Sequence, residues 1–318
     1  MSLPVSLQHL RLPVICAPMF IVSNPKLVVE QCKAGVVGSF PALNARGEGA
    51  LNEWLTGIKA ELVADEVAGG HPAPFAVNQI VHPSNNRLAE DIQVCLSHQV
   101  PIFITSLQAP PKELVDGAHA YGGIVLHDVI NVRHAKKALE AGVDGLILVA
   151  AGAGGHAGML SPFALVGEIR KFYDGLIVLS GSIATGDAIL GAQAMGADLA
   201  YMGTRFICTT EANADAAYKQ GIIDAAANDV IYTNLFTGVH GNYLRQSIVT
   251  AGLDPDNLPV ADKTKMNFGS GGNSAAKAWK DIWGVGQGVG LIDDAPSTAE
   301  LVDHLEMEYK AARARLVL

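Results

Sequence analysis

A glycine-rich segment with one histidine is the part of this sequence best suited to chemistry. Residues 143–159 run from an apolar stretch into a turn that carries His156 and the glycines Gly152, Gly154, Gly155 and Gly158. Glycine lets a backbone approach a bound molecule closely, and an imidazole exchanges protons near neutral pH. The segment therefore predicts a strand that ends at a ligand, with His156 as the acid–base group. A turn whose glycines serve only backbone geometry is the structural alternative.

A dinucleotide fingerprint is a second alternative for this turn. Residues 152–157 satisfy the pattern G-x-G-x-x-A, and Asp174 follows about 20 residues later. In a dinucleotide fold, however, the acidic residue belongs at the end of the following strand, whereas Asp174 precedes the next apolar run. The match also follows the sixth predicted strand instead of opening a βαβ pair, so we favour a different ligand.

Composition indicates a well-cored globular protein that binds a small molecule. Of 318 residues, 49% are hydrophobic and 17% are charged, and the formal net charge is -9. No stretch combines clustered Lys and Arg with aromatic residues, so we expect neither nucleic acid nor a membrane surface as a partner. The N-terminal residues do not follow a signal-peptide pattern, and no apolar run is long enough to span a membrane. We therefore expect a cytoplasmic protein, and the sequence leaves its oligomeric state open.

The cysteines fit reduced thiols better than a disulfide framework or a zinc site. They are widely spaced and form no C-x-x-C motif: Cys16, Cys32, Cys95 and Cys208. We predict that Cys16 and Cys95 pack in the core, and we predict no metal site.

Short apolar runs alternate with amphipathic stretches, which predicts parallel strands separated by helices. The stretch 131–141 is a typical helix of this kind, with apolar residues at three- and four-residue spacing and Gly142 as its stop. The predicted strands are 13–19, 35–40, 74–80, 100–105, 123–127, 145–150, 176–180 and 199–203.

A repeated phrase supports this alternation. Residues 141–145 and residues 195–199 both end a predicted helix with glycine and open a strand just after an aspartate. Eight strand–helix units predict the α/β class and a TIM (β/α)8 barrel, ahead of an open doubly wound sheet.

The chain continues beyond the eighth strand for longer than one closing helix requires. We predict a barrel formed by residues 1–208 and 270–318, and a second, smaller, mainly helical lobe formed by residues 209–269. Within the lobe, residues 211–227 predict a long helix. The glycine-rich residues 268–274 predict a connection or lid, and Ser297 with Glu300 predicts the capped start of a closing helix.

A barrel places its site at the carboxyl ends of its strands, so the strand ends form one set of candidates. These are Ala17, Pro18, Met19, Asn78, Gln79, His127, Asp128, the turn at 152–158, Ser180, Gly181, Ser182, Gly203 and Thr204. Many barrels hold phosphate after the seventh and eighth strands, through backbone N–H groups and a helix N-terminus. We therefore predict phosphate binding by residues 180–182 and 203–204.

Several of these motifs together resemble the FMN-dependent nitronate monooxygenases, formerly called 2-nitropropane dioxygenases. The resemblance spans nearly the whole chain. It rests on residues 18–19, 77–78, 154–158, 180–182, 202–206 and 283–294.

The resemblance implies a TIM barrel that holds FMN, with dioxygen and a small-molecule substrate as partners. Ala17, Pro18 and Met19 would contact the flavin ring. Asn78 and His127 would address its polar edge, although related flavoproteins can carry a lysine at the end of the fifth strand. The remaining cofactor-binding residues it implies are Ala150, Gly154, Gly155, Ser180, Gly181, Ser182, Gly203, Thr204 and Gln287.

In this resemblance His156 matches the active-site histidine. It would take the acidic α-proton of a nitroalkane or orient a nitronate, and the flavin would pass electrons to dioxygen to give a carbonyl compound and nitrite. The same barrel also resembles FMN-dependent NAD(P)H reductases of the enoyl-acyl-carrier-protein and quinone types. A non-catalytic FMN-binding protein is the third hypothesis.

Overall fold

Eight parallel strands form the centre of the molecule. The computed structural model describes residues 3–261 and 281–316. Each strand falls on a predicted apolar run, so the predicted alternation of strands and helices is confirmed. The strands are β1 (Val14–Cys16), β2 (Gly38–Pro41), β3 (Phe75–Val81), β4 (Ile102–Leu107), β5 (Ile124–Val129), β6 (Gly145–Val149), β8 (Leu176–Ser180) and β9 (Leu199–Met202).

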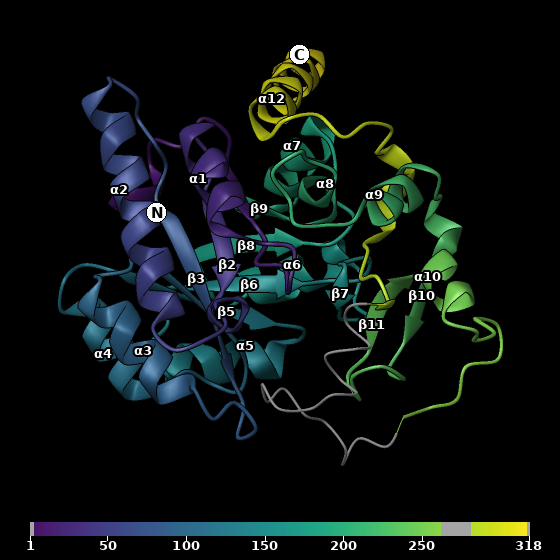
Figure 1. Ribbon diagram of the computed structural model, residues 1–318, viewed down its shortest axis with the longest axis horizontal. Coiled ribbons are helices and arrows are strands. Elements are labelled where there is room, and N and C mark those ends of the chain that lie inside the picture. Colours follow the sequence, from purple (N-terminus) through teal and green to yellow (C-terminus); the bar gives the residue numbers. More distant parts are fainter. Residues whose placement is uncertain (1–2, 262–280, 317–318) are drawn as a thin grey trace.

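The strand order is that of a barrel. Neighbours run β1-β9-β8-β6-β5-β4-β3-β2, all in parallel, and the bridge between Ile15 and Val37 brings the chain just before β2 back to β1. Cys16 donates its backbone N–H to the carbonyl of Val37 at 2.8 Å, which reinforces this closure. Helices surround the strands (Figure 1), as predicted for a TIM barrel.

Two of the helices begin at the capping residues that the sequence indicates. Asn131 accepts the N–H of His134 at the start of α5, and Ser297 exchanges hydrogen bonds with Glu300 at the start of α12, as a capping box does. In Figure 1, α12 lies beside α7 in the upper part of the view, outside the strands. The helices are α1 (Pro25–Lys33), α2 (Ala50–Val67), α3 (Leu88–Ser97), α4 (Lys112–His119), α5 (Val132–Glu140), α6 (Pro162–Arg170), α7 (Gly186–Met195), α8 (Thr204–Ile207), α9 (Ala216–Ile223), α10 (Arg245–Thr250) and α12 (Thr298–Leu316), with 3-10 turns at Val5–Leu7, Ala42–Asn44, Ala227–Asp229 and Gln287–Leu291.

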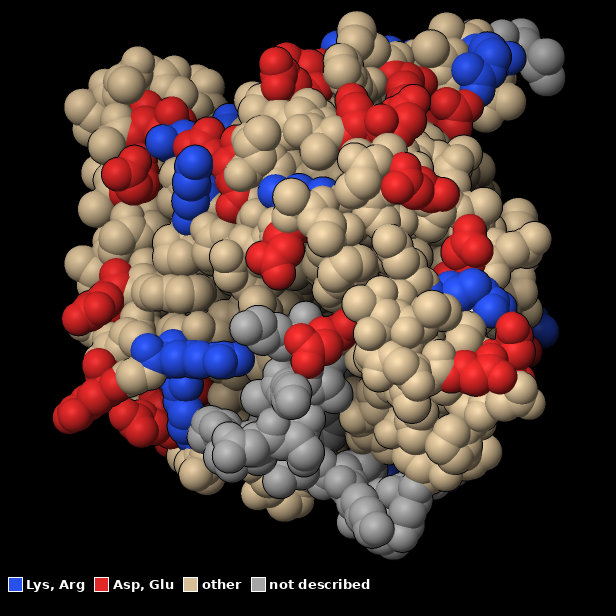
Figure 2. All heavy atoms as spheres, turned by 45° about the vertical axis from the view of Figure 1, so that its right-hand side comes forward, with Lys and Arg blue, Asp and Glu red and all other residues tan. Residues whose placement is uncertain are grey.

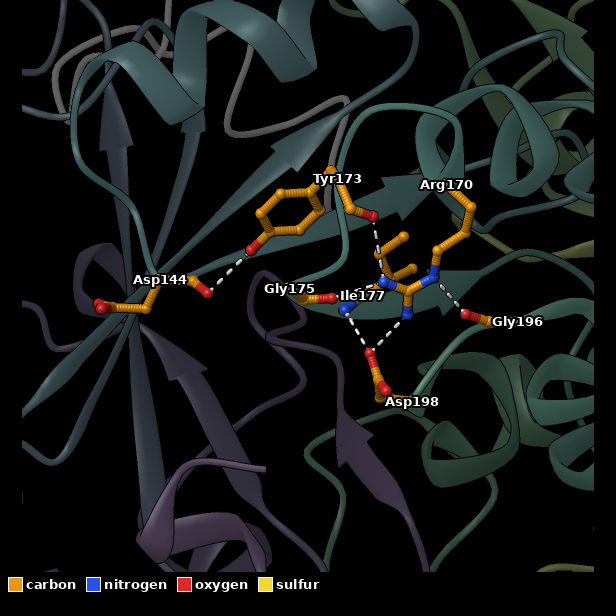
Figure 3. Close-up of polar contacts among 7 residues, drawn as sticks. All are labelled: Asp144, Arg170, Tyr173, Gly175, Ile177, Gly196 and Asp198. Carbon is orange, nitrogen blue, oxygen red and sulfur yellow. Dashed lines mark hydrogen bonds and ion pairs between the residues drawn. The ribbon is translucent and has the colours of Figure 1, made fainter. Parts of the chain in front are cut away.

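The repeated glycine–x–aspartate phrase forms the same contact twice. Asp144 accepts the backbone N–H of Val125 at 2.7 Å, and Asp198 accepts that of Ile177 at 2.8 Å. Each aspartate therefore ties the start of its own strand to the start of the preceding strand. In Figure 3, Arg170 joins Asp198 at 2.8 Å and also donates to the carbonyls of Gly175 and Gly196.

The core has two layers because successive side chains on a strand point to opposite faces. On β5, Ile124 and Leu126 point into the barrel, while Val125 and Val129 pack outward against the helices. The four cysteines are buried and unpaired thiols, as their spacing predicts. In the described ranges, no helix is long and apolar enough to cross a membrane. On the face shown in Figure 2, acidic and basic side chains are interspersed.

The segment after β9 is less helical than predicted. It contains α9 and α10, but also an antiparallel sheet in which β11 (Gly241–Leu244) lies between β10 (Val230–Thr233) and β7 (Gly155–His156). The predicted helix over 211–227 is wrong at both ends. Asp215 precedes α9, which stops at Ile223, before a 3-10 turn. The predicted connection at 268–274 lies outside the described residues.

Candidate active site

One large cavity opens at the carboxyl ends of the barrel strands. Its volume is about 1530 Å³, which is larger than many small-molecule sites. It brings together most of the residues predicted to form the site. These are Ala17, Pro18, Met19, Asn78, Gly154, Gly155, His156, Ser180, Gly181, Ser182, Gly203 and Thr204.

The loop after β1 is held in place by Asn44, from the 3-10 turn after β2. The Asn44 side chain donates to the carbonyls of Met19 and Ser23, at 3.0 and 2.8 Å, and accepts the N–H of Ile21 at 3.0 Å. Ile21 has a positive φ of 68°, a conformation that a β-branched residue rarely adopts without such support. The apolar wall around Met19 is therefore fixed before any ligand binds.

Asn78, at the edge of the cavity, is 6% exposed. Its amide donates to the carbonyl of Ile104 at 3.2 Å and approaches the Ser106 hydroxyl at 3.4 Å. These contacts orient the amide from the neighbouring strand β4. An oriented amide is suited to the polar edge of a planar ligand because it offers both a donor and an acceptor.

The ends of β8 and β9 form a polar corner of the cavity. Gly181 and Ser182 both have positive φ, 130° and 57°, and a Cβ on Gly181 would lie 2.6 Å from the carbonyl of Ala151. Thr204 begins the turn after β9, where its hydroxyl accepts the N–H of Gly286 at 2.9 Å. Hydroxyls and backbone at adjoining strand ends offer the kind of donors that bind phosphate.

The segment at 283–294 crosses this corner, as the family resemblance implies. Gln287 donates its backbone N–H to the carbonyl of Gly152 at 2.9 Å, and a Cβ on Gly154 would lie 2.8 Å from the nitrogen of Gly286. Glycine at position 154 therefore permits the close packing of the two segments. Tyr218 fixes the same segment from α9, donating to the carbonyl of Gly284 at 2.6 Å.

His156 is held between the barrel and the lobe. It lies in β7, where it pairs with Gly241 of β11, and its Nε2 lies 3.0 Å from the hydroxyl of Thr237. Asn242 also donates to the carbonyl of Ala153 at 2.7 Å, which anchors the glycine-rich turn. Burial lowers the pKa of His156 to about 4, so the imidazole is neutral at pH 7.

Three predicted cofactor residues do not line the cavity. His127 points to the outer layer, where it is 4% exposed and its Nδ1 lies 2.8 Å from the Thr105 hydroxyl. The prediction that His127 addresses the flavin is corrected, because the alternation along β5 turns its side chain away. Ala150 is fully buried in the outer core, and the side chain of Gln287 is exposed beside the cavity wall.

Two residues with a place at this site, Tyr201 and Thr237, were not predicted, and Asp128 was predicted only as one of the strand-end candidates. Asp128 follows Leu126 on the inner face of β5, and Tyr201 lies on the inner face of β9; both line the cavity. Thr237 reaches His156 from the lobe. An alternation of polar and apolar residues along β5 could have shown that Asp128 faces the cavity and His127 faces outward. The strand is buried on both faces, so its sequence has no such alternation.

The residues of the cavity fit a flavin cofactor. The wall at residues 17–19 is apolar, Asn78 supplies an oriented amide, and residues 180–182 with 203–204 supply the polar corner. The cavity volume accommodates a planar ring, a phosphate-bearing tail and a substrate. Among the described residues, no group of three His, Cys, Asp or Glu side chains could hold a metal ion.

Comparisons with known proteins agree with the fold and show the family. The family model for nitronate monooxygenase matches residues 3–308. A nitronate monooxygenase of Paraburkholderia phytofirmans is 28% identical over 96% of this chain and 94% of its own length. One of Neurospora crassa is 27% identical, over 93% and 89%. A solved structure described as nitroalkane oxidase of Streptomyces ansochromogenes has a TM-score of 0.80 at 23% identity, covers 97% of this chain and 98% of its own, and shows the shared fold.

Members of this family are flavin-dependent oxidoreductases. The match covers the barrel, the glycine-rich turn with His156 and the crossing segment at 283–294. The chain belongs to the nitronate monooxygenase family.

Proposed function

We propose that this protein binds FMN and oxidises alkyl nitronates with dioxygen, to give a carbonyl compound and nitrite. One observation supports this most directly. His156 stands on the wall of a cavity lined by flavin-type strand ends, in a chain that belongs to the nitronate monooxygenase family. Nitroalkanes, the neutral acids of nitronates, are the second substrate class.

In this proposal different residues of the cavity bind different parts of the cofactor. Residues 17–19 and Asn78 hold the ring, and residues 180–182 with 203–204 hold the phosphate. The bound flavin accepts electrons from the substrate and delivers them to dioxygen. Because Asn44 and the crossing segment fix these walls in advance, binding costs little reorganisation of the protein.

His156 acts on the proton at the carbon that bears the nitro group. At pH 7 its imidazole is neutral, because burial lowers its pKa to about 4, so a ring nitrogen is available to accept a proton or to hydrogen-bond the substrate. A neutral nitroalkane must lose its α-proton, whereas a nitronate has already lost it. His156 is therefore needed as a base for nitroalkanes and only for orientation with nitronates.

The lobe forms the substrate side of the site in this proposal. Asn213, Asp215, Tyr218 and Val239 from this part of the chain line the cavity, opposite the barrel strands. This placement supports the division into a barrel of residues 1–208 and 270–318 and a lobe of residues 209–269. We place the protein in the cytoplasm, where reduced thiols such as its buried cysteines persist.

The test is anaerobic stopped-flow absorbance of the flavin-loaded protein. Wild type is mixed separately with propionate 3-nitronate, nitroethane, NADH and NADPH. We expect flavin reduction by the nitronate and not by the reduced nicotinamides. Fast reduction by NADH or NADPH alone would replace this proposal with a reductase, and bound flavin without any turnover would indicate a binding protein.

A pair of histidine variants makes the test specific to His156. We expect His156→Ala to lose most of the reduction by nitroethane and to retain more of the reduction by nitronate. His240→Ala is the matched control, because His240 is exposed, stacks on Tyr232 with ring centroids 5.0 Å apart, and does not line the cavity. Equal losses of flavin reduction in the two variants would show that His156 has no acid–base role.

A further inference from the structure

Two polar groups lie at the floor of the cavity, where the barrel interior is otherwise apolar. Asp128 extends from the inner face of β5, and Tyr201 extends from the inner face of β9. Below them the interior is filled by aliphatic side chains such as Leu126, Ile147 and Val178. A carboxyl group at this depth has a large desolvation cost when it is ionised.

Neither group is satisfied by the protein around it. The Asp128 Oδ1 atom and the Tyr201 hydroxyl are both buried, and neither has a hydrogen-bond partner among the described residues. Buried polar atoms in native proteins nearly always have partners, so an orphaned pair on a cavity floor points to a ligand or to a function. The mechanism proposed above uses neither residue.

Burial, and not a neighbouring charge, shifts the pKa of Asp128. The titratable groups that line the cavity with Asp128 are Tyr201, His134, His156, Tyr218, Arg46, Arg87, Glu48, Glu90, Asp91 and Asp215, and Cys16 from β1 lies near Tyr201. Burial alone raises the pKa of Asp128 to about 7, and no nearby cation offsets it. The carboxyl group therefore changes protonation near neutral pH.

We propose that Asp128 is a proton acceptor built into the floor of the flavin pocket, which takes up a proton when negative charge develops in the cavity above it. This inference rests on the proposed flavin binding. A negative charge on the ligand and an ionised Asp128 repel each other in a site with little water, so one of the charges must be neutralised. Asp128 is the group that can be neutralised, because a proton on its carboxylate removes its charge.

The balance of the step is simple. A bound flavin that takes up two electrons and one proton would carry one negative charge. In this proposal a second proton moves from solvent to a carboxylate oxygen of Asp128, where it forms an O–H bond. Reoxidation by dioxygen would remove both electrons and the negative charge, and the protons held by the flavin and by Asp128 would pass to the reduced oxygen or to solvent, so that Asp128 is ionised again. Tyr201 stays a neutral phenol throughout, since burial and the nearby Asp128 raise its pKa well above its usual value.

The experiment measures the number of protons taken up when the flavin is reduced, and it does not depend on catalytic turnover. The flavin-loaded protein is reduced anaerobically with a measured amount of reductant in weakly buffered solution above pH 7, and an indicator dye reports proton uptake for each flavin. Infrared difference spectra of the same reaction detect the carbonyl stretch of a newly protonated carboxyl group. The variants are Asp128→Asn, which keeps the shape of the side chain, and Tyr201→Phe. Asp174→Asn removes an exposed carboxylate away from the cavity as the control.

We expect up to two protons for each two electrons in wild type, Asp174→Asn and Tyr201→Phe, and one proton fewer in Asp128→Asn. The infrared carboxyl band appears in the first three proteins and is absent from Asp128→Asn. Unchanged proton uptake in Asp128→Asn overturns the proposal, and loss of the second proton in Tyr201→Phe assigns the site to the tyrosine instead. A protein that binds no flavin contradicts the proposed function, whereas bound flavin without the second proton contradicts only this inference.

Discussion

The Nε2 atom of His156 lies 3.0 Å from the Oγ1 atom of Thr237, which joins the glycine-rich turn of the barrel to the lobe. The Thr237 hydroxyl donates to the carbonyl of Val239 at 3.0 Å, and a hydroxyl has only one hydrogen. Its oxygen therefore accepts from His156, whose Nε2 carries the proton. The lobe thus selects the tautomer of the imidazole as well as its position.

We predict that Thr237→Val slows flavin reduction by nitroethane about fivefold, because a neutral hydrogen bond of this kind contributes about 1 kcal/mol. Flavin content is expected to stay at the wild-type level, since Thr237 does not line the cavity. Thr237→Ser, which keeps the hydroxyl, is the control and should retain most of the rate. Stopped-flow rates for the two variants, side by side, check the prediction. Equal rates in both would show that the hydroxyl does not orient His156.

A second prediction concerns the close packing at Gly154. A Cβ at this position would lie 2.8 Å from the backbone nitrogen of Gly286 and 3.0 Å from the carbonyl carbon of Val285. Backbone cannot move aside as a flexible side chain can, so we expect Gly154→Ala to displace the crossing segment and weaken FMN binding at least tenfold. Fluorescence titration of the apoprotein with FMN measures the change.

The control for this variant is Gly167→Ala in α6, where an added Cβ meets no atom within 4 Å. Alanine is the better helix former, so this variant should gain about 0.5–1 kcal/mol in the free energy of unfolding and keep wild-type affinity for FMN. Wild-type affinity in Gly154→Ala would show that the crossing segment plays no part in holding the cofactor.

His127 contributes to the pH dependence of stability. Burial lowers the pKa of His127 to about 4 from an ordinary value of 6.5, so the unfolded chain binds a proton over this interval that the folded chain does not. The free energy of unfolding is therefore expected to fall as pH falls from 6.5 to 4, by up to about 3 kcal/mol from this residue. Urea unfolding across this range measures the loss. His127→Gln should have a shallower pH dependence than wild type, and an identical slope would refute the assignment.

Much of the barrel could be predicted because its signals are local. Each strand is a short buried run, and the repeated aspartates at Asp144 and Asp198 mark where two of the strands begin. The lobe could not be predicted in the same way. There β10 pairs with β11, and β11 pairs with Gly155 and His156, which are far away in the sequence, so no local pattern indicates the partner strand.

The residues of the site could also be predicted only in part. Glycines, serines and the histidine of the strand-end turns stood out by residue type, and the cavity brings them together. His127 and Asp128 are adjacent in the sequence, and only the alternation of side chains on β5 decides which one faces the cavity. A strand buried on both faces carries no polar–apolar alternation from which this could be inferred.

The repeated aspartate contact gives a last prediction. Asp198 accepts the N–H of Ile177 and the guanidinium of Arg170, both at 2.8 Å, so it joins β8 to α6 through one carboxylate oxygen (Figure 3). Asp198→Asn removes the charge from two hydrogen bonds, and we expect it to lower the free energy of unfolding by about 1–3 kcal/mol. Asp187→Asn is the control, because Asp187 pairs with Arg315 at the exposed end of α12, where an ion pair contributes less than about 1 kcal/mol. Chemical denaturation of both variants compares the two contacts, and an equal cost would mean that the repeated aspartate does not anchor the barrel strand.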